Sequence, residues 1–220
     1  TTEMWDAHNL LDDTHLATLD HPETYDFVDI SQNNHSPSDR HWSNPQKVRE
    51  HIEASGKIRP MNSVKIYGSN TGRYGTTRDA QERFWRNVVG GLATTRFHRP
   101  PSGLGLSDIA QMHIQAARML TNEVDIFTCG PHNDLVSDRS WNEAYCSANP
   151  GTDYVIFFPD GGNVVLDVSG ARGKSLAIRW MDIRNRSWLF DYRPAKSDGD
   201  QVRVETPTEE GYWAAVIKAA

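Results

Sequence analysis

The sequence predicts an α/β protein: a partial barrel of βα units, half of the TIM type, followed by a small antiparallel β-sandwich. Up to about residue 130, strand-like and helix-like segments alternate at intervals of roughly 30 residues, which is typical of parallel βα units. From residue 153 onward, short apolar segments recur at roughly 8–12-residue spacing with turn residues between them, as in an antiparallel sandwich. We therefore predict a barrel-like domain at 1–130, a connector at 131–152 and a β-domain at 153–220.

Four strands and three helices are expected in the first domain. The expected strands are the opening segment 1–8, Tyr25–Ser31, Ser63–Tyr67 and Ala93–His98. The expected helices are Gln46–Ser55, with Pro45 in its first turn and Gly56 just past its end, a helix capped by Thr77 that ends at Gly90, and a helix capped by Ser107 that runs from Asp108 to about Thr121. Four strands are half the number in an eight-stranded barrel.

The second domain is predicted from short strands separated by turn sequences. The segments Pro159–Gly162 and Ser197–Asp200 carry the Pro, Asp and Gly residues typical of turns. The expected strands are Tyr154–Phe158, Val164–Val168, Leu176–Trp180, Arg184–Phe190, Gln201–Glu205 and Tyr212–Ile217. The stretch before them has no regular periodicity, and we expect it to be a packed connector.

Composition and charge exclude several classes of protein. The formal net charge is -6 and the pI is near 5.8, without the clustered Lys and Arg that neutralise phosphates, so we expect no nucleic-acid partner. No apolar run is long enough to cross a bilayer, and no Cys/His spacing indicates zinc. We therefore expect no membrane association, no metal and no cofactor.

The cysteines and the first residue bear on the cellular compartment. With only Cys129 and Cys146, no disulfide framework can be deduced, and one bridge or two free thiols are equally compatible with the sequence. Because the chain starts at Thr1, we expect either that a signal peptide has been removed or that the chain is cut from a longer one. A removed signal peptide implies a secreted or periplasmic protein.

Aromatic and polar side chains point to a carbohydrate ligand. The 7 Trp, 7 Tyr and 9 His are many for 220 residues, and such rings stack on the faces of sugars, although core packing is the ordinary alternative for each. In parallel βα units, ligands bind where the strands end. The residues expected to bind substrate there are Trp5, His8, Gln32, Asn33, Asn34, His35, Tyr67, Asn70, Arg73, Arg96 and His98. For the segment 32–35, a turn-rich loop without a ligand is the alternative.

Acidic residues near the strand ends are candidates for catalysis. Cleavage of a glycosidic bond usually needs two carboxyl groups, one to donate a proton and one to act as nucleophile or base. The first strand offers Glu3 and Asp6, of which alternation brings only one toward the barrel axis, and the second strand contains Asp29. The alternatives are solvated acids in a terminal loop and, for Asp29, a structural role in orienting Arg96 or His98.

Several motifs resemble those of bacterial apiosidase-like glycoside hydrolases. In the first domain and the connector they are Val64–Gly68, Arg83–Asn87, Arg96–Pro100, Gly103–Leu106, Asp134–Arg139 and Asn142–Tyr145. The tail, with Tyr154–Pro159, Gly161–Gly162 and Arg179–Ile183, resembles the β-domain labelled as collagen-binding that follows those (βα)8 barrels. The resemblance covers nearly the whole chain and corresponds to the C-terminal half of the barrel.

This resemblance implies hydrolysis of O-glycosidic bonds in plant or microbial oligo- or polysaccharides by a carboxylate acid/base mechanism. Two departures from the family pattern stand out. The family's fourth strand, which carries its acid/base residue, belongs to the half of the barrel absent here. The seventh strand of the family ends in a Gly-Glu pair bearing the nucleophile, where this chain has Gly68-Ser69-Asn70. The acids would then come from Glu3, Asp6 and Asp29.

Three hypotheses follow. The chain is an active glycoside hydrolase whose open barrel edge is covered by a second copy, which predicts a homo-oligomer. Alternatively, it is a noncatalytic carbohydrate-binding protein derived from a glycosidase, or a fragment of a full-length enzyme. The sequence leaves open the sugar, the linkage and whether the anomeric configuration is retained or inverted.

Overall fold

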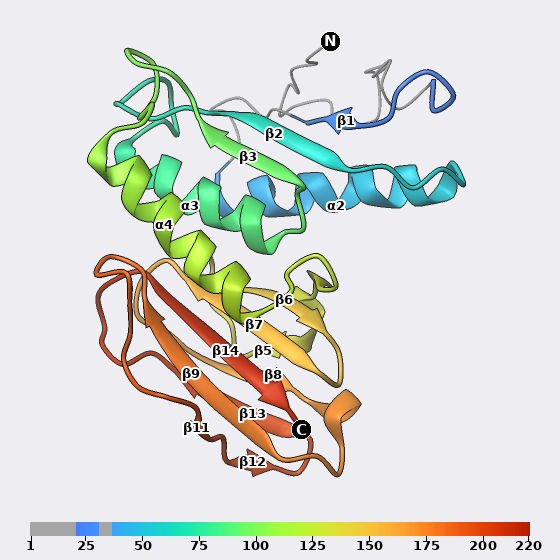
Figure 1. Ribbon diagram of the computed structural model, residues 1–220, viewed down its shortest axis with the longest axis vertical. Helices are drawn as coiled ribbons and strands as arrows, with labels where there is room; N and C mark the ends of the chain where they lie inside the picture. Colours follow the sequence, from blue (N-terminus) through green and yellow to red (C-terminus); the bar gives the residue numbers. More distant parts are fainter. Residues whose placement is uncertain (1–20, 31–36) are drawn as a thin grey trace. The chain divides into compact units, whose positions relative to one another are not determined.

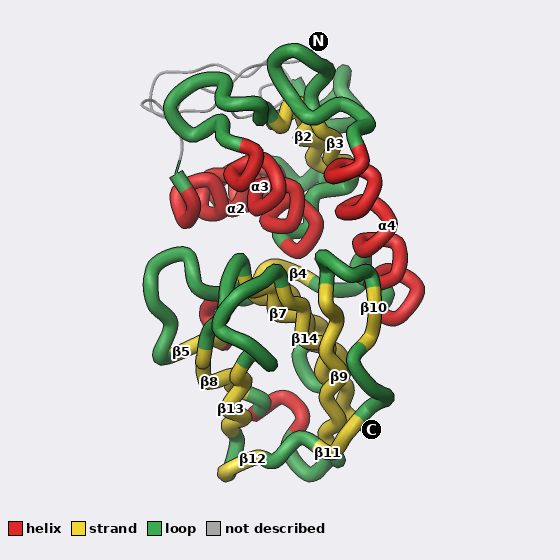
Figure 2. The backbone as a smooth tube through the Cα atoms, turned by 90° about the vertical axis from the view of Figure 1, so that its left-hand side faces the viewer, coloured by secondary structure: helices red, strands yellow, loops and turns green. Residues whose placement is uncertain are grey.

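The computed structural model describes residues 21–30 and 37–220. The described residues form two compact units, the first made of those up to residue 88 together with 92–110 and the second of residues 89–91 and 111–220 (Figures 1 and 2). The expected segment 1–8 and the loop 31–36 lie outside the described residues. Among the described residues, no helix is long and apolar enough to span a membrane.

The first unit contains a parallel sheet with two crossover helices. Its elements in chain order are β1 (Val28–Asp29), α2 (Ser38–Ala54), β2 (Met61–Ile66), α3 (Thr77–Val89) and β3 (Thr94–Phe97). The strand order is β1-β2-β3, and both pairings are parallel, which confirms the predicted parallel βα units. Both helices lie on one face of this sheet (Figures 1 and 2).

Apolar residues at alternate strand positions bury that face. Val28, Ile30 and Met61 from the sheet form a buried cluster with Val48 and Ile52 of α2, one turn apart on the helix. On the other side, Phe97 of β3 stacks on Phe84 of α3, with ring centroids 5.0 Å apart. These contacts identify the side of each strand that faces the helices. The polar residues that alternate with the buried apolar ones lie on the opposite face of the sheet.

The first helix begins earlier than predicted. It starts at Ser38, so Pro45 lies inside α2 rather than in its first turn. An internal proline removes one helical hydrogen bond, and proline is favoured in the first turn, where the sequence places Pro45 ahead of Gln46–Ser55. The extra turns bury His41 and Trp42, and the apolar area that Trp42 removes from water offsets the lost bond. The helix ends as expected, with Gly56 at φ 73° just beyond it.

Hydroxyl side chains cap the next two helices, as predicted, but the capping residue of α3 lies one position earlier than expected. For α3 the capping residue is Thr76 instead of Thr77, since the Asp79 N–H donates to the Thr76 hydroxyl (3.1 Å) and the Asp79 carboxylate accepts from the Thr76 N–H (2.9 Å). The helix α4 (Asp108–Glu123) has Ser107 at its start, as predicted, with the Ala110 N–H donating to the Ser107 hydroxyl at 3.4 Å.

The second unit consists of α4 from residue 111 onward and two antiparallel sheets. One sheet has the order β10-β9-β14-β7-β6-β4, with β11 also paired to β9, and the other has the order β12-β13-β8-β5. The strands are β4 (Gly130–Pro131), β5 (Val136–Ser137), β6 (Tyr145–Asn149), β7 (Asp153–Phe158), β8 (Asn163–Asp167), β9 (Leu176–Asp182), β10 (Ser187–Trp188), β11 (Arg193–Pro194), β12 (Ser197–Asp198), β13 (Gln201–Glu205) and β14 (Trp213–Ala219). Short 3-10 turns at Asn133–Leu135 and Ser169–Ala171 complete it.

The two antiparallel sheets share one buried core. It joins alternate residues of β6, β7 and β14, such as Cys146, Ile156 and Ala215, to Leu166 of β8 and Val204 of β13. The period of two in both sheets is the reason for this shared core, because each strand turns every second side chain toward the other sheet.

The stretch 131–152, expected to be a connector, contributes strands to both sheets. β6 pairs with β7 over its whole length, and β5 pairs with β8. β6 is buried on both faces, with Tyr145 and Cys146 both inaccessible to solvent, so it lacks the alternation of polar and apolar residues that marks a half-buried strand. By contrast, the expected strand Arg184–Phe190 is reduced to Ser187–Trp188, because a turn with Arg186 at φ 51° precedes it.

The two cysteines are free and buried. β4 and β6 pair with Pro131 opposite Ser147, which puts Cys129 three residues out of register with Cys146, or about 10 Å along the strand. A disulfide needs Cα atoms within about 7 Å, so this register rules out the bridge that the sequence left open. Burial raises the pKa of both thiols, which makes them poor nucleophiles.

Glu123 fastens the end of α4 to the larger sheet of the second unit. Its carboxylate accepts hydrogen bonds from the Tyr192 hydroxyl (2.8 Å) and from Arg179 Nη1 (3.1 Å), while its backbone carbonyl accepts from Lys218 Nζ (2.8 Å). The Arg179 guanidinium also lies 4.5 Å from the ring centroid of Trp188. Burial and the Glu123 carboxylate raise the pKa of Tyr192, so the phenol stays protonated and donates.

We expect Glu123→Gln to lower the free energy of unfolding by about 1–3 kcal/mol, because the change removes the charge to which Tyr192 and Arg179 donate and with which Lys218 Nζ, 3.5 Å from Oε1, forms an ion pair. Thermal unfolding followed by circular dichroism measures it. Asp200→Asn is the matched control, since the Arg172–Asp200 pair is exposed and should contribute little. Equal melting temperatures for both variants would contradict this role of Glu123.

His113 of α4 is fully buried against the same unit, edge-on to the Tyr212 ring at 5.6 Å. Burial, and then the positive charge of Arg184, lower the pKa of His113 to about 4. The unfolded chain, with a histidine pKa near 6.5, therefore binds a proton between pH 6.5 and 4 that the folded chain does not.

It follows that stability falls as the pH drops from 6.5 to 4, by on the order of 3 kcal/mol from this one residue, and levels off below. Denaturant titrations at several pH values measure the slope. We expect His113→Gln to flatten it in that window, whatever the variant does to stability at neutral pH. An unchanged slope would show that His113 is not the residue responsible.

Candidate functional site

The carboxyl ends of β2 and β3 lie side by side at one edge of the parallel sheet. The loop 67–76 follows β2, and the loop 98–107 follows β3. In open and closed parallel sheets alike, the groups that bind ligands gather at this edge. Two of the residues predicted from the sequence, Tyr67 and His98, meet there.

The Tyr67 and His98 rings are stacked, with centroids 4.6 Å apart and planes inclined by 20°. Their contact depends on an irregularity in β2, where the register with β3 shifts between Ser63 and Ile66. Met61 faces the helices, so strict alternation would turn Tyr67 toward them as well. The shift pairs Ile66 with Phe97, which faces the helices, and Tyr67 consequently joins His98 on the opposite face.

The hydrogen bonds of His98 hold its ring through Nδ1. Its Nδ1 lies 3.3 Å from the Arg99 carbonyl oxygen and 2.9 Å from the Ser102 hydroxyl. A hydroxyl both donates and accepts, so either tautomer can make the Ser102 contact. Nε2, on the other side of the ring, can then donate to or accept from a ligand hydroxyl beside the Tyr67 ring.

The loop after β3 folds back onto the end of β2 and holds both rings. Gly68 N–H donates to the Ser102 carbonyl (3.3 Å), and the Ser69 hydroxyl donates to the Gly103 carbonyl (2.9 Å). Gly105 N–H donates to the His98 carbonyl at 2.7 Å, which closes the loop on itself. The edge of the sheet is therefore held by hydrogen bonds within and between the two loops, most of them from backbone N–H groups.

Three other described residues of the predicted site lie near this edge, in the loop after β2 or on β3. Asn70 is exposed at φ 61° in the loop after β2, and the guanidinium of Arg73 lies 5.2 Å from the Tyr74 ring centroid in the same loop. Arg96 is exposed on β3, two residues before His98 and so on the same face of the strand. Each is within the loops or strand that border the pair.

Asp29 lies at the other end of the sheet. It is buried and pairs in register with Asn62, which pairs with Thr94, and the Thr94 hydroxyl donates to Asn62 Oδ1 at 2.9 Å. All three lie on the face away from the helices. His98 is four residues beyond Thr94, or about 13 Å along the strand, so Asp29 is not brought beside the Tyr67–His98 pair.

The remaining predicted site residues lie outside the described part of the chain. They are Glu3, Trp5, Asp6, His8, Gln32, Asn33, Asn34 and His35. Within residues 21–30 and 37–220, no group of three or more His, Cys, Asp or Glu side chains is arranged to hold a metal ion.

Sequence reasoning missed Ser102, the partner of His98, and a group of buried charges on α3. Glu82 accepts from Arg78 Nε (2.7 Å) and from Arg86 Nη1 (3.1 Å), and it is 3% exposed. Burial and the neighbouring Arg86 lower the pKa of Arg83 to about 10. Burial, together with the charges of Arg83 and Arg86, holds the pKa of His41 on α2 well below its usual value. The spacing of Arg78, Glu82 and Arg86 by four residues is the signal in the sequence.

Gly103 provides a test of how closely the two loops must approach. A Cβ atom at this position would lie 2.2 Å from the His98 carbonyl oxygen. We expect Gly103→Ala to displace the loop, to lower the free energy of unfolding by about 1–3 kcal/mol and to weaken any ligand binding at the pair. Calorimetry and binding assays measure these effects. In the control Gly130→Ala the nearest atom is 3.8 Å away, and equal losses in both variants would refute the close-approach argument.

No family model matches the chain, and no curated protein sequence is similar to it. Solved structures are similar in fold. A glycoside hydrolase family 5 protein from Bacteroides vulgatus has a TM-score of 0.61 and 11% identity over 88% of this chain, and a second glycoside hydrolase has a TM-score of 0.58 and 9% identity over 83%. The fold is glycoside hydrolase-like.

A GH30 endoxylanase from Clostridium papyrosolvens has a TM-score of 0.51 and 11% identity over 96% of this chain. The chain spans about half the length of these three structures, 50%, 47% and 52% respectively. These similarities extend over several glycoside hydrolase families and do not single out the apiosidase-like family. At such identities they establish the fold and leave the reaction to be argued from the residues.

Proposed function

We propose that the chain binds carbohydrate at the Tyr67–His98 edge and acts on O-glycosidic bonds as part of a glycoside hydrolase. The stacked pair at the carboxyl ends of parallel strands, in a glycoside hydrolase-like fold, is the observation that carries this proposal. The three described parallel strands would be one section of a (βα)8 barrel, and the two antiparallel sheets with a common core would be an appended β-sandwich.

The chemistry of the pair suits a sugar. Tyr67 is half-buried and supplies a flat aromatic surface with a hydroxyl at its rim. His98 supplies Nε2 as a hydrogen-bonding nitrogen beside it, and Asn70 supplies an amide from the adjacent loop. Flat apolar surface with polar groups at its margin matches a pyranose or furanose ring, whose C–H face is apolar and whose hydroxyls project outward.

The acids of the reaction are proposed from the sequence. Glu3 and Asp6 are candidates for one of the two acids, because alternation brings only one of them toward the barrel axis, and Asp6 is expected nearer the end of the first strand. Asp29, in register with Asn62 and Thr94 and about 13 Å short of His98 along the strand, is placed neither to contact substrate at the pair nor to orient His98. A noncatalytic carbohydrate-binding protein is the second candidate, favoured by Gly68-Ser69-Asn70 at the place where the apiosidase-like family has its nucleophile.

Ligand binding at the pair is tested with Tyr67→Ala. Titration calorimetry against a panel of xylo-, gluco- and arabino-oligosaccharides should show binding by the parent chain and at least tenfold weaker binding by the variant, since the stacking surface is lost. Tyr25→Ala is the matched control, a half-buried tyrosine just before the amino end of β1. Equal affinities in Tyr67→Ala and the parent would overturn the site.

Hydrolysis is tested separately, with Glu3→Gln, Asp6→Asn and Asp29→Asn assayed on aryl glycosides. Loss of turnover with retained binding in one or two variants supports a hydrolase. Binding without turnover in the parent supports the noncatalytic alternative. The mass of the chain in solution, measured alongside, tests whether a second copy covers the open sheet edge in a homo-oligomer. Cell fractionation tests whether the protein is secreted or periplasmic.

A further inference from the structure

The second unit carries an exposed tryptophan that the Tyr67–His98 site does not use. Trp141 is 64% exposed, in the loop between β5 and β6. Trp141 therefore presents a large aromatic surface to solvent, of the kind that stacks on the apolar faces of sugars.

The backbone around Trp141 is fixed by hydrogen bonds. Glu143 N–H donates to the Ser140 carbonyl (3.2 Å), and the Ser140 N–H donates to the Glu143 carboxylate (2.6 Å), which closes a four-residue turn with Trp141 at its second position. Asn142, at φ 56°, accepts a hydrogen bond from the Tyr145 hydroxyl at 2.7 Å. The turn is therefore anchored to β6 by its own hydrogen bonds, and a turn fixed in this way loses little conformational entropy on binding a ligand.

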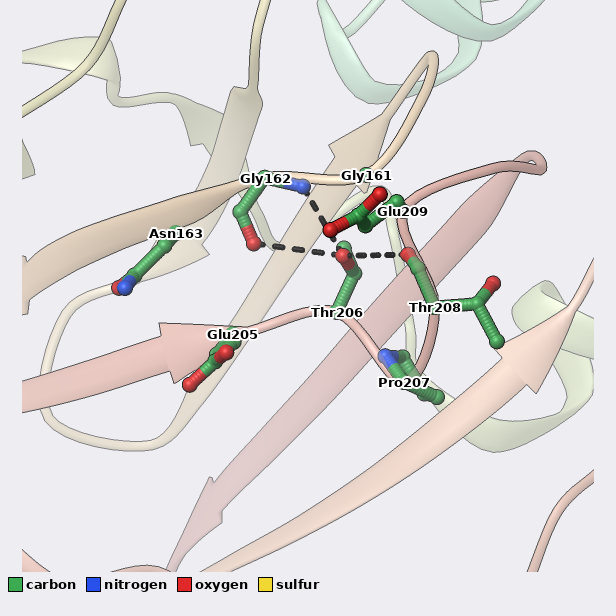
Figure 3. Close-up of a pocket in the computed structure, with 8 residues that line it drawn as sticks. All are labelled: Gly161, Gly162, Asn163, Glu205, Thr206, Pro207, Thr208 and Glu209. Atoms are coloured by element: carbon green, nitrogen blue, oxygen red, sulfur yellow. Dashed lines mark hydrogen bonds between the residues drawn. The ribbon is translucent and has the colours of Figure 1, made fainter.

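The same turn is tied to a pocket. The second carboxylate oxygen of Glu143 accepts from the Asn163 N–H at 2.8 Å, and a Cβ atom at Gly162 would lie 2.8 Å from Glu143 Cγ. Asn163 and Gly162 in turn line a cavity of about 370 Å³, whose other side is the segment Glu205–Glu209 (Figure 3). One carboxylate thus couples the Trp141 turn to the wall of the pocket.

The lining of this pocket is polar and largely preformed. The Thr206 hydroxyl accepts from the Gly162 N–H (2.9 Å) and lies 2.9 Å from the Thr208 carbonyl, to which it donates (Figure 3). The Asn163 side-chain oxygen accepts from Arg203 Nη1 at 3.0 Å, which leaves its amide N–H groups as donors to the solvent side. Glu205 and Glu209 supply exposed carboxylates, which accept from paired hydroxyls.

These features favour a carbohydrate over a protein partner. The core of a protein interface is depleted in charged residues, whereas the pocket wall to which the Trp141 turn is bonded through Glu143 carries Asn163, Glu205 and Glu209. The volume falls in the range of small-ligand sites. The two carboxylates repel polyanions, which favours neutral sugars over uronic acids.

We propose that Trp141 and the pocket lined by Gly161–Asn163 and Glu205–Glu209 form a second carbohydrate-binding site, which holds a neutral polysaccharide by stacking on Trp141 and hydrogen bonding to the pocket. The site lies wholly within the second unit. It does not depend on the proposed function of the Tyr67–His98 pair.

The test uses affinity electrophoresis of the full chain through gels that contain arabinoxylan, mixed-linkage β-glucan, xyloglucan or galactomannan, with polygalacturonate as the acidic comparison. We expect at least one neutral polysaccharide to retard the parent chain and polygalacturonate not to do so. Trp141→Ala should weaken that binding at least tenfold, Trp141→Phe should retain part of it, and Glu205→Gln should weaken it a few-fold.

Phe127→Ala is the matched control, because Phe127 is an aromatic residue of the same unit that is 80% exposed and lies outside the pocket lining. Trp141→Ala should leave binding of short oligosaccharides and turnover of aryl glycosides unchanged, whereas Tyr67→Ala should leave polysaccharide retardation in place. Failure of this proposal can therefore be distinguished from failure of the proposed function. No retardation of the parent, equal loss in Phe127→Ala, or a Trp141→Ala variant that binds as the parent does would overturn the proposal. If Trp141→Ala changed the mass of the chain in solution but left polysaccharide binding intact, the partner of Trp141 would be a second copy of the chain. That result would also overturn the proposal.

Discussion

The arrangement of the first unit depends on the parallel pairing of β2 with β3. Parallel strands need a crossover, and α3 supplies it while covering one face of the sheet, so the loops that leave both strands are brought to the same edge. The register shift between Ser63 and Ile66 then decides which side chains that edge presents. Without the shift, Tyr67 would face the helices and His98 would stand without its stacking partner.

The second unit is organised by two sheets that bury a common core and by α4, which is held through polar contacts at its end. Glu123 joins the helix to Arg179 of β9, Lys218 of β14 and Tyr192. These are partly buried contacts, in which each donor has a defined acceptor, so they specify how the helix lies on its sheet better than apolar contacts alone would. The raised pKa of Tyr192 and the lowered pKa of His113 both follow from this burial.

Two places on the chain combine an aromatic ring with adjacent hydrogen-bonding groups. At one, Tyr67 stacks on His98, whose Nδ1 is held by Arg99 and Ser102. At the other, Trp141 is carried by a turn whose Glu143 also binds the wall of a pocket. In both, the backbone is fixed in advance by local contacts, which is how a site holds a ligand with many hydroxyl groups at a low entropic cost.

The sequence by itself determined the alternation of strands and helices, the end of α3 at Gly90, the cap at Ser107 and the strand Gln201–Glu205. These features depend on local periodicity and capping chemistry, which act over a few residues. It also named Tyr67 and His98, though by their place at strand ends and not by their contact.

Only the tertiary structure decided the features that depend on distant partners. The burial of Trp42 carries α2 through Pro45, burial on both faces makes β6 a strand without alternation, and pairing with β3 turns Tyr67 to the side of His98. The out-of-register pairing of β4 and β6 keeps Cys129 from Cys146. In each case long-range packing or pairing outweighs a local preference of about 1–3 kcal/mol, and no short window of sequence contains both partners.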